Sequence, residues 1–141
     1  MKTWGVLVLL LVLSAGGAAG SQAAADTIEW HTYEAGMARS KAETKKVFLH
    51  FYADWCTFCV EMDRKTFKDP AVIATLNRNF IPIRVDSDRN KEIATLFRVK
   101  GLPDSWFMDE AGAPIGHRPG FIPPEQLLAI LKVIMTGSGA K

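Results

Sequence analysis

The chain of 141 residues contains two cysteines, Cys56 and Cys59, three positions apart. A Cys-x-x-Cys pair at the junction of a buried strand and a helix can form and break a disulfide. The first sulfur then lies at the helix N-terminus, where unpaired N–H groups and the helix dipole favour an anion. We therefore predict that Cys56 is the nucleophile and that Cys59 attacks the mixed disulfide that Cys56 forms.

Three other interpretations of the cysteine pair are a structural zinc site, covalent haem attachment and an inert disulfide. A structural zinc site needs four ligands, but the chain has no further cysteine and its three histidines are scattered. Covalent haem attachment needs a histidine directly after the second cysteine, where this chain has Val60. An inert structural disulfide is the third, although a bridge that closes so small a loop adds little stability. Reactivity explains the pair best, and the predicted mechanism uses no metal and no cofactor.

The segments around the pair alternate between strand and helix patterns. The nearly unbroken apolar run 47–53 predicts a central strand buried on both faces. A helix opens at the cysteine pair, and Asp69-Pro70 starts another, because Asp is a good N-cap and proline is tolerated at the first helical position. The other predicted elements are an extended piece over 27–31, a solvent-facing helix over 33–46, strands over 80–85, 105–108 and 114–118, a helix over 86–97 capped by Ser87 or Asp88, and a final helix from 123. This order indicates an α/β fold with a central mixed sheet covered by helices.

The first 25 residues have the pattern of a secretory signal peptide. Lys2 precedes the apolar run 6–13, and small residues follow. An uncleaved membrane anchor is disfavoured because the run is shorter than the roughly 18 to 20 residues that span a bilayer. We expect residues 1–25 to be a cleaved signal peptide, with cleavage near Gly20 as the alternative site. Residues 26–141 then form a single exported domain that does not stay inserted in the membrane.

The predicted mature domain is close to neutral. Removing Lys2 leaves 16 basic residues from the 17 in the chain, against 15 acidic ones, so the formal net charge falls from +2 to +1. This balance gives no support for nucleic acid or an anionic membrane as a partner.

The residues 51–59, Phe-Tyr-Ala-Asp-Trp-Cys-Thr-Phe-Cys, resemble the active-site signature of the thioredoxin superfamily. Gly101-Leu102-Pro103 resembles the loop whose cis-proline faces the cysteines in that superfamily. The resemblance covers about 47–134. Within the superfamily, Glu61, Asp63 and the residues that follow them are most similar to the periplasmic C-terminal domain of bacterial disulfide reductases of the DsbD type.

This resemblance implies a thioredoxin fold and a carrier of reducing equivalents in the periplasm. Such a carrier takes electrons from a membrane-embedded thiol donor, here expected to be another protein, and reduces oxidised substrate proteins through transient mixed disulfides. We expect it to act as a monomer. The resemblance also implies that Pro103 is cis, that Leu102 and Pro103 bind the substrate backbone, and that Trp55 shields the sulfur pair. The alternatives are an ordinary turn proline and a plain core aromatic.

The chain departs from the thioredoxin pattern six positions before the first cysteine, where His50 replaces a buried aspartate that is thought to move the proton of the second thiol. A buried imidazole with a pKa near neutrality can do the same work, and as a cation it would also favour a thiolate. The alternative is a packed, hydrogen-bonded histidine with no part in the chemistry.

Three acidic residues also bear on the redox couple. Asp63 and Glu61 match acidic positions of the DsbD-type domain, where negative charge near the sulfurs raises the thiol pKa, unless both are solvated surface charges. Asp104 follows the predicted cis-proline where the family usually has threonine, which would place one more negative charge near the site.

The dipeptide between the cysteines, Thr57-Phe58, sets the expected direction of the reaction. Phe58 offers neither a hydrogen bond nor a charge to a thiolate, and a poorly stabilised thiolate favours a reductant. The leading prediction is therefore a protein-disulfide reductase. The alternatives are an oxidase or isomerase that uses the same residues, and a binding module whose disulfide switches a partner on or off.

Overall fold

The computed structural model describes residues 24–137, so all but the last two residues of the predicted signal peptide lie outside the described residues. In this part of the chain a single mixed sheet has the strand order β2-β1-β3-β4. The central strand β1 pairs in parallel with β2 and antiparallel with β3, which pairs antiparallel with β4. The strands are β1 (Lys46–Tyr52), β2 (Phe80–Asp86), β3 (Asp104–Met108) and β4 (Pro114–Pro119).

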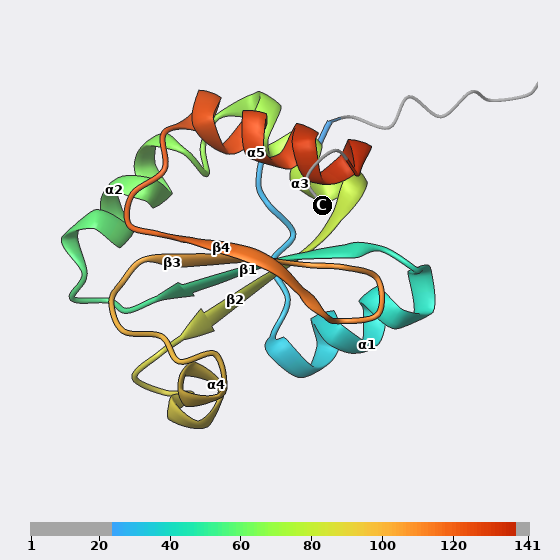
Figure 1. Cartoon of the computed structure of the whole chain (residues 1–141). Helices are drawn as coiled ribbons and strands as arrows, with labels where there is room; N and C mark the ends of the chain where they lie inside the picture. Colours follow the sequence, from blue (N-terminus) through green and yellow to red (C-terminus); the bar gives the residue numbers. More distant parts are fainter. Residues whose placement is uncertain (1–23, 138–141) are drawn as a thin grey trace, which may run out of the picture.

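Helices cover both faces of the sheet, as the sequence predicts (Figure 1). One face carries α2 (Thr57–Lys65), α3 (Pro70–Asn79) and α5 (Pro124–Thr136). The other carries α1 (Tyr33–Glu43) and α4 (Lys91–Leu96). None of the helices within residues 24–137 is long and apolar enough to cross a membrane.

The strand β1 separates two apolar cores. Val47, Leu49 and Phe51 pack on the face of α1 and α4, whereas Phe48 packs on the face of α2, α3 and α5. Each of these side chains is inaccessible to solvent, and burying one contributes roughly 1.5 to 3 kcal/mol. His50 stacks beside Phe48, with ring centroids 6.3 Å apart, so the one histidine of β1 lies on the face of the sheet that α2, α3 and α5 cover. Burial on both faces explains why this segment, apart from Lys46 and His50, consists of apolar and aromatic residues.

The helix α1 is shorter than predicted and is not wholly solvent-facing. It ends at Thr44, which has a left-handed φ of 52°, rather than continuing to residue 46. Gly36 and Ser40 are buried, and a methyl group added at Gly36 would overlap the side chain of Ile83 on β2. Glycine is required here by the close approach of the helix to the sheet, and Ile83 has no free space to move into because it is itself buried.

The helix predicted over 86–97 begins later, at Lys91. The carboxylate of Asp86 accepts hydrogen bonds from the backbone N–H groups two and three residues further on, at 3.0 and 3.3 Å. An aspartate that binds its own following backbone in this way forms a turn that competes with helix. The predicted caps, Ser87 and Asp88, therefore lie in a turn, and Asp88 is free to contact the active-site loop.

The strand β4 forms one edge of the sheet. It is bounded by Pro114 and Pro119, and its side chains are exposed or half-exposed. The turn that joins it to β3 is closed by Asp109, whose carboxylate accepts from the N–H groups of Ala111 and Ala113 at 2.9 and 2.8 Å. This is the hairpin that the sequence predicts.

Candidate active site

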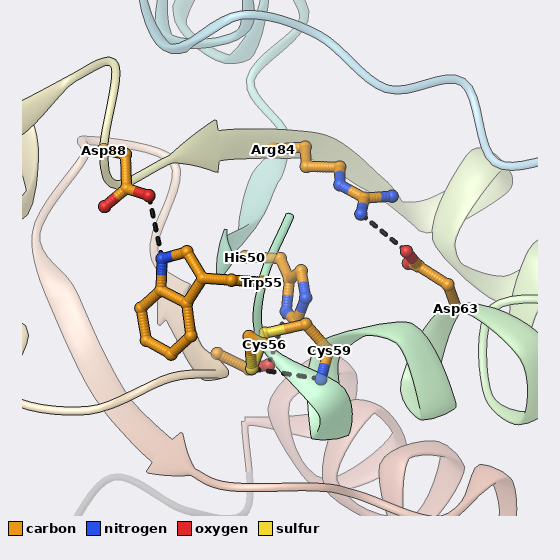
Figure 2. The surroundings of a disulfide bond; sticks show 8 residues. His50, Trp55, Cys56, Cys59, Asp63, Arg84 and Asp88 are labelled. Atoms are coloured by element: carbon orange, nitrogen blue, oxygen red, sulfur yellow. Dashed lines mark hydrogen bonds and ion pairs between the residues drawn. A yellow bond between two sulfur atoms is a disulfide. The ribbon is translucent and has the colours of Figure 1, made fainter. Parts of the chain in front are cut away.

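Cys56 occupies the N-cap position of α2. Its backbone is extended, with φ −79° and ψ 109°, and its N–H donates to the carbonyl of Ala53 at 3.1 Å, which turns the chain from β1 into the helix. Its sulfur accepts the backbone N–H of Cys59 at 3.2 Å, in the place of the side-chain oxygen that usually caps a helix (Figure 2). The same N–H can stabilise the Cys56 thiolate when the disulfide is reduced.

The two cysteines are joined by a disulfide, with their Cα atoms 5.2 Å apart. Cys56 is 4% exposed and Cys59 is 1% exposed, so both are buried and the cysteine at the helix start is the slightly more accessible of the two. This asymmetry fits the assignment of Cys56 as the sulfur that meets a partner and of Cys59 as the enclosed one. Within residues 24–137 no group of three or more His, Cys, Asp or Glu side chains is arranged to hold a metal ion.

The loop before β3 packs against the cysteine pair. Leu102 contacts the cluster formed by Ala53, Cys56 and Cys59, and the Leu102–Pro103 peptide bond is cis. The carbonyl of Pro103 accepts the N–H of Gly120 at 2.7 Å, which ties the loop to the end of β4. The structure thus brings Leu102 to the cysteines, with the cis Pro103 next to it in the chain. The contact of both residues with a substrate stays a prediction.

Trp55 is not a core aromatic, because 70% of its surface is exposed. Its indole N–H donates to the carboxylate of Asp88 at 2.8 Å, which holds the ring beside Cys56 (Figure 2). A groove of about 400 Å³ runs between Trp55 and the loop at Leu102, with Lys91 and Lys100 also lining it. An accessible ring over a groove next to the sulfur is suited to contact a partner protein.

His50 lies in a row across three strands, between Arg84 on β2 and Ser105 on β3. It is completely buried, and its Nδ1 is 3.1 Å from the hydroxyl oxygen of Ser105. Its Nε2 has no hydrogen-bond partner among the described residues. Figure 2 shows the imidazole next to the disulfide, pointing toward the sulfurs.

Burial and, to a lesser extent, the positive charge of Arg84 lower the pKa of His50 from 6.5 to about 3. The imidazole is therefore neutral at physiological pH when the disulfide is intact. The expected pKa near neutrality is wrong, because desolvation of the charged ring dominates. A permanent histidine cation that favours the Cys56 thiolate is excluded for the same reason, whereas a neutral proton acceptor is compatible with the site.

This pKa shift predicts a pH dependence of stability. Between the unfolded pKa of 6.5 and the folded value of about 3, the unfolded chain binds a proton at His50 that the folded protein does not. The free energy of unfolding must therefore fall as the pH falls through this window, by about 2 kcal/mol between about pH 7.5 and pH 5.

Urea unfolding of the wild type and of His50→Leu at both pH values measures the effect. The variant lacks the titrating group, so its stability should fall by about 2 kcal/mol less than that of the wild type. Equal losses in the two proteins would contradict a buried neutral His50.

The two acidic residues of α2 are both paired. Asp63 accepts from Arg84 at 2.7 Å, and the Arg84 guanidinium lies 3.9 Å from the ring centroid of Tyr52. Glu61 forms an ion pair with Lys65 one turn along the helix and is partly exposed. The structure thus places Asp63 against a cation and Glu61 on the helix surface, so each negative charge near the cysteine helix is partly compensated.

Asp104 lies on the opposite face of the sheet from His50. Its carboxylate accepts from the indole N–H of Trp106 at 3.0 Å and contacts Nδ1 of His117 at 3.0 Å. The expectation that Asp104 adds negative charge beside the sulfurs is wrong, because the alternation of β3 turns its side chain toward α4. The same alternation turns Ser105 toward His50.

Sequence reasoning missed two residues of this site, Ser105 and Arg84. Both flank His50 through strand pairing and are separated from it by 55 and 34 positions. The alternation of the short apolar segment around Trp106 was the available signal for Ser105, since it puts Ser105 and Phe107 on one face.

The sequence profile of the thioredoxin-like domain family matches residues 33–134. Among curated proteins, the chain is similar to the thiol:disulfide interchange protein DsbD of Vibrio vulnificus strain CMCP6, with 40% identity over 85 residues, which is 57% of this chain and 14% of that protein. It is also similar to DsbD of Actinobacillus pleuropneumoniae serotype 5b, with 38% identity over 93 residues, covering 62% and 16%. The chain thus spans only about a seventh of the length of these relatives.

Solved structures show the same fold. A thioredoxin from Thermus thermophilus superposes with a TM-score of 0.72 and 28% identity, covering 81% of this chain and 92% of the other. The oxidoreductase DsbH superposes with a TM-score of 0.68 and 20% identity, covering 80% and 88%.

Proposed function

The chain belongs to the thioredoxin-like domain family, and from that premise we propose that it is an exported protein-disulfide reductase working through Cys56 and Cys59. Its fold, its DsbD relatives and its cysteine pair make it a disulfide oxidoreductase of this family. The proposal adds the direction of the reaction, the periplasmic location after cleavage of residues 1–25, and action as a monomeric domain of residues 26–141.

One observation carries the proposal above the others, namely the position of the Cys56 sulfur at the N-cap of α2. In the reduced protein the thiolate of Cys56 attacks a disulfide of the partner protein, and one partner sulfur leaves as a thiolate. Cys59 then loses its proton and attacks Cys56, so the second partner sulfur leaves and the Cys56–Cys59 disulfide closes. Two electrons pass from the cysteine pair to the partner, and the partner thiolates take up protons.

The direction of this reaction follows from how weakly the thiolate is held. The only hydrogen bond to the Cys56 sulfur within the described residues comes from the N–H of Cys59. Phe58, which follows in the first turn, points an exposed apolar side chain to solvent. With so little support, the Cys56 thiolate is a poor leaving group. The reduced protein is then less stabilised relative to the protein with the disulfide, which favours a reductant over an oxidase.

Both cysteines must be re-reduced after each turnover. We propose a membrane-embedded thiol donor in this role, in keeping with the similarity to DsbD proteins, and oxidised exported proteins as substrates. The groove beside Trp55 is where we place the partner segment that carries the disulfide.

The reduction potential of the cysteine pair tests the direction. After equilibration with glutathione buffers and trapping of free thiols, a reductant should show a potential below about −200 mV, whereas strong oxidants lie near about −120 mV. A value near the latter would overturn the reductant proposal in favour of an oxidase or isomerase. The same preparation should accelerate the reduction of insulin by dithiothreitol, and no acceleration would favour a redox-gated binding module.

A further inference from the structure

The hydroxyl of Ser105 is fully buried, and within the described residues its hydrogen-bond partner is Nδ1 of His50, at 3.1 Å. The two residues face each other directly across the β1–β3 ladder, so the pairing register fixes their distance. The other ring nitrogen, Nε2, is buried without a hydrogen-bond partner among the described residues, and the imidazole as a whole lies next to the disulfide (Figure 2). A buried polar atom without a partner costs about 1 to 3 kcal/mol. An unpartnered Nε2 at a reactive site therefore indicates that this nitrogen takes part in the reaction.

We infer that Ser105 is a positioning residue, which accepts the Nδ1–H of His50 and thereby keeps the lone pair of Nε2 open toward the Cys59 thiol. This inference rests on the proposed dithiol exchange and deepens it. In the mixed disulfide, Nε2 takes the proton of the Cys59 thiol. The Cys59 thiolate then attacks Cys56, the bond between Cys56 and the partner sulfur breaks, and the partner thiolate is protonated by the imidazolium or by water.

The alternative tautomer explains the site less well. If Nε2 carried the proton, this N–H would be buried with no acceptor among the described residues, and its direction is fixed by the ring. With the proton on Nδ1, two groups are left over: the lone pair of Nε2, which the thiol of reduced Cys59 would fill, and the Ser105 hydroxyl hydrogen, which can rotate about the Cβ–Oγ bond. The Nδ1–H then also needs no rearrangement when the ring becomes an imidazolium, because Oγ accepts from it before and after proton transfer.

The charges that face His50 act in both directions. Arg84 opposes protonation of the ring, and this is one cause of the lowered pKa of His50. Asp63 is paired with Arg84 and offsets part of that charge. The imidazolium forms only together with the Cys59 thiolate, and their mutual attraction stabilises the pair at this buried position.

The resolving step can be measured apart from the first attack with 5,5′-dithiobis(2-nitrobenzoate). The reduced protein releases one thionitrobenzoate when Cys56 attacks the reagent and a second when Cys59 resolves the mixed disulfide. The first phase depends on reagent concentration and the second does not. Ser105→Thr and Ser105→Val are a matched pair, because the two side chains have the same shape and only threonine keeps the hydroxyl.

We expect Ser105→Val to slow the second phase by at least about tenfold near pH 7 and to leave the first phase unchanged. A general acid–base group contributes about 100-fold to 10,000-fold to a rate, and this variant removes only the support of such a group. Ser105→Thr should stay within about threefold of the wild type by the same reasoning. The deficit of Ser105→Val should vanish above about pH 10, where the Cys59 thiol ionises without help. A deficit that is the same at every pH would indicate a structural effect and would overturn the inference.

Two further variants separate the possible failures. Ser105→Ala repeats the test without added bulk if the valine variant does not fold. His50→Leu should slow the second phase at least as much as Ser105→Val, and an unchanged rate would refute both roles. A wild type that shows no second phase would refute the proposed dithiol exchange itself, whereas a normal wild type with an unimpaired Ser105→Val would refute only the role of Ser105.

Discussion

Replacing Cys59 by serine is expected to stop turnover and to leave the protein joined to its partners as a mixed disulfide through Cys56. The first attack needs only Cys56, which remains at the helix start. Resolution would then depend on an external thiol instead of a sulfur whose Cα lies 5.2 Å away. Well-oriented intramolecular groups act like reagents at molar concentrations that no solution reaches, so insulin reduction should fall by at least about a thousandfold.

The trapped species can be collected from cells that export the variant. Non-reducing gels should show adducts that disappear on reduction, and mass spectrometry of those adducts identifies the substrates and the thiol donor. Wild-type protein from the same fraction is the control, since it should show few adducts. If Cys59→Ser turned over insulin normally, Cys59 would have no resolving role and the mechanism would be wrong.

Replacing Cys56 by serine should abolish both turnover and adduct formation. A serine hydroxyl is not ionised near neutral pH and does not attack disulfides, while Cys59 is buried and lies inside the helix instead of at its N-cap, so it should not take over. The fold of α2 should survive, because serine is among the preferred N-cap residues and its oxygen can accept the N–H that now binds the sulfur.

The two variants therefore differ in a single measurable respect. Both lack the disulfide, so both lose whatever stability it provides, and thermal unfolding should give them similar midpoints. Adducts should form in Cys59→Ser and be absent in Cys56→Ser. Adducts in the second variant would make Cys59 the nucleophile and would reverse the assignment.

Much of this architecture could be predicted because local patterns and the fold agree. The apolar run of β1, the Asp69-Pro70 start of α3 and the hairpin closed by Asp109 all fold as their residue types favour. Asp69 caps α3 by accepting from the N–H groups of Ala71 and Val72, as predicted from the dipeptide alone. The position of Cys56 at a helix start follows from the same kind of local signal.

What the sequence could not supply depends on contacts across the sheet. The pKa of His50 is set by complete burial and by Arg84, neither of which is visible in the neighbouring residues of β1. The orientation of Asp104 cannot be predicted from its neighbours, because it depends on the register of β3, and a shift of one residue moves every side chain to the other face of the sheet. α4 begins late because the carboxylate of Asp86 accepts a hydrogen bond from the backbone N–H of Asp88, which forms a turn in place of the first helical residues.

The exposed edge strand β4 also bears on aggregation of the protein with other copies of itself. An open strand edge is a template on which a second copy can add a strand and begin to aggregate. Pro114 and Pro119 carry no backbone N–H, and His117 and Arg118 place polar groups between them, so neither end of β4 can continue a regular ladder. The hairpin that completes the active-site sheet thus also limits self-association at its outer edge.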